Sequence, residues 1–172
     1  MIKHSIIRRV IIFGLLAILM VLGYFAWPKF CEKQNITQLE YKNAEYGFSV
    51  SLPATWMGYT VTNDEWSGDA IGDQLGETHY TTGTVVSIHN PKWTKEVMYQ
   101  DIPIMIFTLN QWEELQQEKF HIGAAPIPPS ELGRNAKYVF ALPARYNFAF
   151  PLGFEEVDQI IQGKPLKTFG PK

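Results

Sequence analysis

An uncharged, proline-free apolar run over Val10–Trp27 constrains this chain more than any other feature of its sequence. As an α-helix, its 18 residues would extend about 27 Å, close to the thickness of the hydrocarbon core of a bilayer. The nine residues before it are polar and basic, with Lys3, Arg8 and Arg9. We therefore expect a tail at residues 1–9 and one transmembrane helix at residues 10–27.

A cleaved secretory signal has the same layout, so the two alternatives must be compared. Cleavage requires small residues, but bulky rings occupy Tyr24, Phe25 and Trp27 near the end of the run. A lipoprotein signal requires small residues before its cysteine, whereas Lys29 and Phe30 precede Cys31. Aromatic residues at the end of the run are typical of a membrane interface. The pattern favours an uncleaved, single-pass signal-anchor.

Charge at the two ends of the run predicts its orientation. Arg8 and Arg9 adjoin the run directly, whereas the lysines after it are diluted by Glu32 and Glu40. Positive charge favours the cytoplasmic side. We expect an N-terminus in the cytoplasm and a C-terminal domain outside a bacterial cytoplasmic membrane, with the lipid bilayer as the partner of residues 10–27.

The remainder of the 172-residue chain is acidic, with 12 basic residues against 17 acidic ones after residue 27, a net charge of −5. This balance argues against binding of nucleic acid, which requires excess positive charge. The single cysteine excludes an internal disulfide framework. Residues 28–40 are polar with scattered charge and are expected to be a juxtamembrane spacer.

The soluble part carries the patterns of several short strands and two helices. Alternating or β-branched runs predict strands over Tyr46–Leu52, Met57–Thr62, Thr84–His89, Ile102–Thr108 and Lys137–Leu142. Asn110, with Glu113 three residues on, predicts the start of a helix, and Gly153–Gln162 predicts a second. Because strands and helices do not alternate regularly, we expect an α+β domain with a mainly antiparallel sheet flanked by helices.

Four short segments of the sequence stand out together: Tyr46-Gly-Phe-Ser-Val-Ser-Leu-Pro-Ala-Thr-Trp56-Met-Gly-Tyr59, Ile104–Trp112, Lys137–Ala144 and Glu155–Gln162. They resemble PsbP-like domains, in particular their uncharacterised, membrane-anchored bacterial members. The resemblance covers residues 41–169 and implies an α/β/α sandwich around an antiparallel sheet. It implies no chemistry, because a fold does not determine function.

An acidic segment at Asn63–Gly83, with no Lys or Arg, is expected to be a long surface connection. Asp69, Asp73 and Glu77 are spaced by four, and His79 follows. On a loop these side chains could converge on a metal cation, although a solvated loop is favoured. Trp66 in this segment either tucks back onto the sheet or is exposed as a partner contact.

No pattern of a catalytic nucleophile or of a metalloprotease is present in the sequence. His89 is interpreted as a strand-end histidine that makes hydrogen bonds. We therefore expect a binding or assembly module without catalytic activity or cofactor, whose partner is an unidentified protein or small ligand. The alternative is an extracytoplasmic hydrolase or cation-dependent enzyme that uses Asp69, Asp73, Glu77 and His79.

Overall fold

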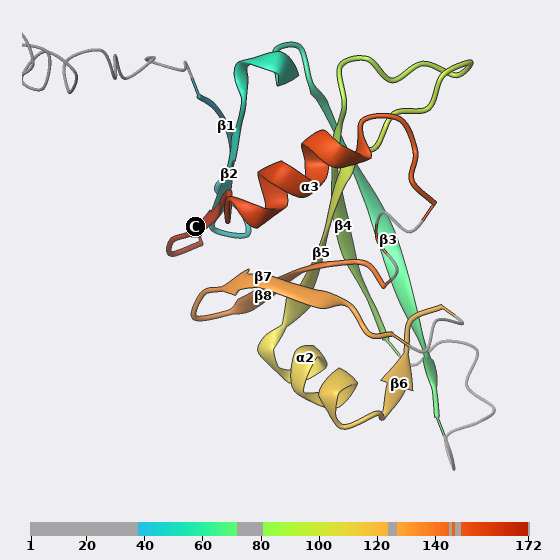
Figure 1. Cartoon of the computed structure of the whole chain (residues 1–172). Helices are drawn as coiled ribbons and strands as arrows, with labels where there is room; N and C mark the ends of the chain where they lie inside the picture. The colour runs from blue at the N-terminus through green and yellow to red at the C-terminus, as the bar shows by residue number, and fades with distance from the viewer. Residues whose placement is uncertain (1–37, 72–80, 124–126, 145, 147–148, 172) are drawn as a thin grey trace, which may run out of the picture. The chain divides into compact units, whose positions relative to one another are not determined.

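The computed structural model describes residues 38–71, 81–123, 127–144, 146 and 149–171 (Figure 1). The expected tail at 1–9, the expected transmembrane helix at 10–27 and most of the expected spacer lie outside these ranges. Within the described ranges, the helices are too short or too polar to cross a membrane.

Two antiparallel sheets make up the described part of the domain. The smaller sheet has the order β1 (Leu39–Asn43), β2 (Phe48–Leu52) and β9 (Leu166–Thr168). The larger one has the order β6 (Phe120–His121), β3 (Thr60–Ala70), β4 (Thr81–His89), β5 (Ile102–Thr108), β8 (Tyr138–Leu142) and β7 (Ser130–Arg134). The helical segments are η2 (Ala54–Trp56), α2 (Leu109–Gln116) and α3 (Phe154–Gln162). The predicted α+β class with a mainly antiparallel sheet is confirmed.

The first core lies between the smaller sheet, α3 and one face of the larger sheet. Phe48, Val50 and Leu52 alternate along β2 and are fully buried in it, as their spacing predicts. Val157 of α3 is buried there too, with Ile160 and Ile161 packed at its margin. The hydrophobic side of the amphipathic helix α3 therefore packs against this core.

The second core lies on the opposite face of the larger sheet, under α2. Consecutive residues of a strand point to opposite faces, so Ile104 and Ile106 of β5 belong to the first core and Met105 and Phe107 to the second. α2 covers this face with Trp112 and Leu115. Because α2 has only eight residues, it covers the lower half of the sheet in Figure 1, and no other helix of the described residues packs in the second core.

The start of α2 differs from the prediction. Thr108, not Asn110, is the N-cap: its hydroxyl accepts a hydrogen bond from the Gln111 backbone N–H at 3.2 Å, and the Gln111 side chain accepts from the Thr108 backbone N–H at 2.9 Å. Asn110 is within the helix. The same Gln111 side chain also donates to Thr81 at 2.8 Å. Thr108 and Gln111 themselves match the Ser/Thr-x-x-Glu/Gln pattern of a capping box, and the contact with β4 further holds the Gln111 side chain.

The expected connection over Asn63–Gly83 is also wrong in large part. β3 continues to Ala70 and β4 begins at Thr81, so that Trp66 pairs with Gly83 in a regular antiparallel ladder. Two glycines of this segment have a packing role: a methyl group on Gly83 would lie 2.5 Å from the Trp66 ring, and one on Gly68 would lie 2.4 Å from Phe120. They make room for rings within a strand.

Candidate functional site

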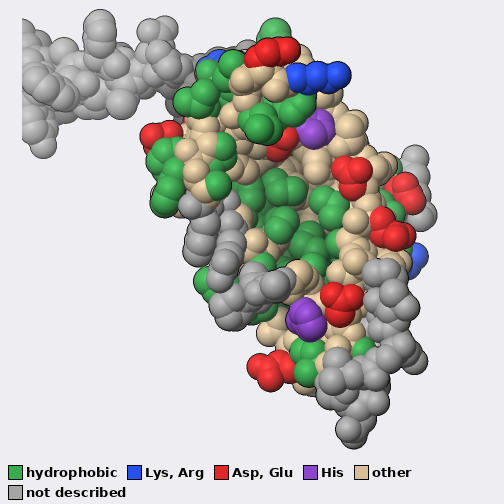
Figure 2. Space-filling model, turned by 90° about the vertical axis from the view of Figure 1, so that its right-hand side faces the viewer, with side chains coloured by type: hydrophobic (Ala, Val, Ile, Leu, Met, Phe, Trp, Pro, Cys, Tyr) green, Lys and Arg blue, Asp and Glu red, His purple; other side chains and the backbone are tan. Residues whose placement is uncertain are grey.

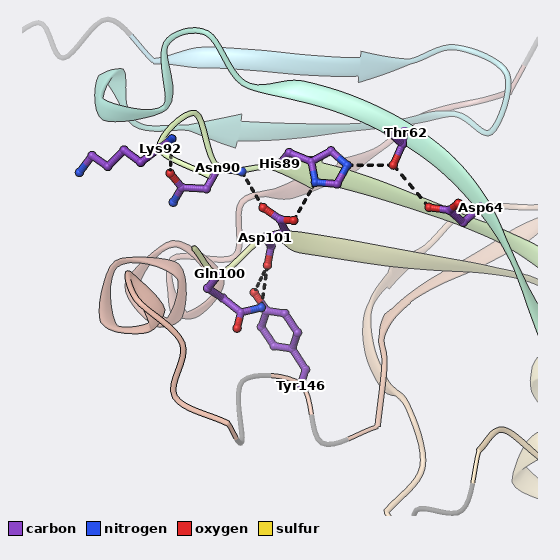
Figure 3. Close-up of polar contacts among 8 residues, drawn as sticks. All are labelled: Thr62, Asp64, His89, Asn90, Lys92, Gln100, Asp101 and Tyr146. Carbon is purple, nitrogen blue, oxygen red and sulfur yellow. Dashed lines mark hydrogen bonds and ion pairs between the residues drawn. The ribbon is translucent and has the colours of Figure 1, made fainter. Parts of the chain in front are cut away.

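A chain of polar side chains crosses β3 and β4 and reaches the start of β5 (Figure 3). His89, the last residue of β4, has its Nδ1 2.7 Å from Asp101 Oδ2 and its Nε2 2.9 Å from the Thr62 hydroxyl. Thr62 pairs with Ser87, two residues before His89, so both side chains lie on one face. The sheet register alone therefore brings them together.

Asp101 is held in place by its second oxygen. Asp101 Oδ1 accepts the backbone N–H of Asn90 at 2.7 Å, and the Asn90 side chain in turn accepts the backbone N–H of Lys92 at 3.0 Å. Asn90 is 4% exposed. These bonds fix the turn after β4, so the position of the carboxylate is set by backbone and not only by its partner histidine.

Tyr146 supports the same strand end from the other side. Its hydroxyl donates to the Asp101 carbonyl oxygen at 2.7 Å, and Gln100 donates to that oxygen at 3.0 Å. Burial raises the pKa of Tyr146 above its ordinary value, so the phenol stays protonated and remains a donor. The start of β5 is thereby fixed at both its side chain and its backbone.

The hydrogen-bond donors and acceptors of these three side chains determine what the arrangement can do. A carboxylate only accepts, so His89 donates its Nδ1 proton to Asp101, and Nε2 of the neutral ring is an acceptor for the Thr62 hydroxyl. Thr62 also lies 3.4 Å from Asp64 Oδ2. Its single proton can serve one acceptor at a time. The order hydroxyl, imidazole, carboxylate is that of a proton relay.

A shallow cleft of about 340 Å³ adjoins His89. Gly58, Thr60, Asn90, Pro91 and Trp93 complete its walls. Trp93 is 40% exposed, and its ring centroid lies 6.4 Å from that of His89. An exposed indole beside fixed polar groups is suited to contact with a ligand or a partner surface.

The outer edge of β3 is open over most of its length. β4 pairs with Thr60–Gly68, whereas β6 pairs only with Asp69 and Ala70 on the other side. In the part of the chain that the structure describes, no strand occupies the rest of that edge. Figure 2, which views the domain from the side of β3, shows Asp and Glu side chains beside hydrophobic ones.

Of the four predicted metal candidates, Asp69 alone lies within the described residues. Asp69 lies in β3 opposite His121, with its Oδ2 4.0 Å from His121 Nε2. Asp73, Glu77 and His79 lie outside the described residues. Among the residues that are described, no three His, Cys, Asp or Glu side chains are grouped to hold a metal ion.

Trp66 is not exposed to a partner, so the tucked alternative is the correct one. It is 4% exposed and lies 4.6 Å from the Phe107 ring and 6.2 Å, stacked, from Phe120. Its indole N–H donates to the Ile106 carbonyl oxygen at 3.0 Å. The strand, which replaces the expected loop, directs the ring into the second core.

Sequence reasoning identified His89 as a hydrogen-bonding strand end but missed Thr62 and Asp101. One signal was present: if β4 and β5 form a hairpin in which Ile88 pairs with Ile102, as they do, then His89 lies opposite Asp101.

In comparisons with family models, curated proteins and solved structures, the chain matches none.

Proposed function

We propose that this chain is a membrane-anchored binding or assembly module without catalytic activity. In this proposal, residues 1–9 are cytoplasmic, residues 10–27 cross the membrane, and the domain stands outside in a PsbP-like α/β/α arrangement. The apolar run at Val10–Trp27 and the four short sequence segments that resemble PsbP-like domains support it. No cofactor is required for such a role.

The open edge of β3 is the observation that carries the binding role. In an antiparallel edge strand, alternate residues direct unpaired N–H and C=O groups outward. An extended segment of a partner protein can add to such an edge as a further strand. Asp64 and Glu65 are exposed on β3, so the partner segment that fits best carries Lys or Arg.

The His89 cluster prepares this edge for binding. Through its bonds to Asp101 and Thr62, it fixes a β3 side chain that is otherwise exposed. Groups held in place before binding lose less entropy when a partner docks. The cleft beside the ordered turn at Asn90 is also lined by Thr60, the first residue of β3.

Site-specific photo-crosslinking in intact membranes tests this role. A benzophenone amino acid at Asn63, exposed on β3, should give a discrete crosslinked partner whose modified peptide is a basic, extended segment. The same probe at Glu113, exposed on α2, should not. Exchanging Asp64 and Glu65 for Lys should reduce the Asn63 crosslink severalfold. Equal, diffuse crosslinking from Asn63 and Glu113 would contradict the proposal.

The Thr62–His89–Asp101 relay favours a second function, hydrolysis of acyl esters. The Thr62 oxygen would attack the ester carbonyl while its proton passes to His89 Nε2; the proton then leaves with the alcohol, and water releases the acyl group from Thr62. If p-nitrophenyl acetate acetylates the full chain at Thr62, and His89→Gln abolishes this acetylation, the enzymatic function is favoured. Reaction unchanged by Thr62→Val and His89→Gln would exclude it.

A further inference from the structure

Large hydrophobic side chains are exposed on the η2 turn and on the loop between β4 and β5, which lie at the top of Figure 1. Met57 is 68% exposed, Met98 67%, Val97 42% and Trp93 40%. Met57 belongs to the turn after η2, and the others belong to the loop between β4 and β5. The turn and the loop adjoin, because a methyl group on Gly58 would lie 4.0 Å from Pro91 Cβ. We call these four side chains the end surface.

The loop that carries most of the end surface is held by its own hydrogen bonds. Trp93 N–H donates to the Asn90 carbonyl at 2.9 Å, Thr94 N–H to the Val97 carbonyl at 2.9 Å, and Val97 N–H to the Thr94 hydroxyl at 3.0 Å. Its hydrophobic side chains are therefore presented to solvent in a defined arrangement. Several large hydrophobic side chains exposed on adjoining segments are typical of a site of interaction.

Basic side chains accompany the hydrophobic ones. Lys92 and Lys95 are exposed on the same loop, whose acidic residues are Glu96 and, directly before β5, Asp101, which is bonded to His89 and to Asn90. The Lys92 ammonium lies 5.9 Å from the Tyr99 ring, so its stem follows the loop while its charge stays at the surface. Trp and Met beside Lys is the composition of surfaces that lie at a bilayer interface.

The chain enters the domain at this same end. Leu39, at the start of β1, pairs with Leu52, which precedes Pro53 and the η2 turn. Residues 28–38 therefore connect the predicted membrane helix to the end that carries the end surface. At about 3.5 Å per residue, these eleven residues span at most about 40 Å. The end surface cannot move far from the bilayer if the helix is inserted.

We infer that the end surface lies on the lipid of the membrane that holds residues 10–27. This inference rests on the proposed anchor. A tether this short keeps the local concentration of membrane high, so a contact of a few side chains suffices for occupancy. Trp93, Val97 and Met98 enter the headgroup region, and Lys92 and Lys95 contact anionic headgroups. The open edge of β3 then runs away from the bilayer and stays accessible.

The opposite end of the domain supplies matched controls. Leu109, at the start of α2, is 41% exposed, and Ile127, before β7, is 45% exposed. They are as hydrophobic and as accessible as Val97 but lie near α2: Leu109 is its first residue, and Ile127 lines one pocket with Leu115 of α2. A non-specific attraction of exposed hydrophobic residues to lipid would act on both ends, whereas the inferred contact acts on one.

The test uses the full chain with Cys31→Ser, reconstituted in vesicles of three parts phosphatidylcholine to one part phosphatidylglycerol. A single cysteine is introduced by Met98→Cys or, as control, by Leu109→Cys, and each is labelled with NBD. Doxyl-labelled lipid should quench the label at position 98 at least threefold more than the label at 109. Lys92→Glu with Lys95→Glu should reduce the quenching at position 98 severalfold.

Failure of the inference and failure of the anchor give different results. If protein remains in the vesicles after carbonate extraction but positions 98 and 109 are quenched equally, the lipid contact is wrong and the anchor stands. If protein is lost on carbonate extraction, the anchor itself is wrong. Strong quenching at 98 that the two Glu substitutions leave unchanged would contradict the role of Lys92 and Lys95.

Discussion

The carboxylate of Asp101 accepts hydrogen bonds from two partners on the preceding strand end: His89 Nδ1 and the backbone N–H of Asn90, each at 2.7 Å. One bond orients the imidazole and the other closes the turn that leads into the loop at Pro91–Met98. Asp101 therefore joins the His89 cluster, beside the open edge of β3, to the loop that carries most of the end surface.

Replacing Asp101 tests this joint role. Asp101→Asn removes one acceptor oxygen and places an amide N–H₂ against a donor, so the free energy of unfolding should fall by about 1–3 kcal/mol. Asp64→Asn is the matched control, because Asp64 is exposed and its contact with Thr62 is 3.4 Å long. Denaturant unfolding of both variants measures the difference. Equal stability of the two would contradict the account.

Gly83 tests the placement of Trp66. In Gly83→Ala the new methyl group would lie 2.5 Å from the indole ring, so overpacking should lower the free energy of unfolding by about 1–3 kcal/mol. Gly170→Ala is the control, since nothing lies within 4 Å of its added methyl group. The blue-shifted emission expected of a buried Trp66 should also change in the Gly83 variant alone. An unchanged melting curve for Gly83→Ala would place Trp66 elsewhere.

The helix cap distinguishes the observed α2 from the one predicted by local pattern. Thr108→Ala should lower the free energy of unfolding by about 1 kcal/mol, because the Gln111 N–H loses its acceptor. Asn110→Ala should be neutral or slightly stabilising, because alanine favours a helix interior. Thermal unfolding compares the two, and the reverse order would restore Asn110 as the cap.

Tyr146 predicts a loss of stability in alkaline solution. Burial raises its pKa above the ordinary value of 10.0, so the folded state keeps the proton while the unfolded chain loses it. The contribution of Tyr146 to the free energy of unfolding is fully present below pH 10 and declines above it, by up to about 1.4 kcal/mol per pH unit. Tyr146→Phe should flatten the decline measured from pH 9.5 to 11. Parallel profiles for both proteins would show that Tyr146 does not titrate as expected.

The sequence predicted most of the fold where the pattern is long or self-contained. Ile102–Thr108 agrees with β5 residue for residue, and Gly153–Gln162 agrees with α3 to within one residue. β6 and β9 have two and three residues, too few for a period of two to be detected. The predicted strand over Met57–Thr62 includes the start of β3, but the rest of β3 was hidden because Gly68 and the acidic residues are typical of loops and the pairing partner lies outside the local window.

The candidate site was less predictable than the fold, for a related reason. Thr62, His89 and Asp101 are ordinary residues at separations of 27 and 12 positions, and only the register of β3, β4 and β5 brings them together. His89 could be recognised as a strand end, but its partners depend on two pairings at once. Trp66 could not be assigned to core or surface until its segment was known to be a strand.

The N-terminus of the protein as it occurs in the membrane tests the central claim most directly. Intact mass and N-terminal sequencing are measured on protein from carbonate-washed membranes. The account predicts a chain that keeps residues 1–27 and resists extraction, because the bulky residues before Pro28 prevent cleavage. Soluble protein whose first residue follows position 23 would contradict the anchor, and with it the contact of the end surface with lipid.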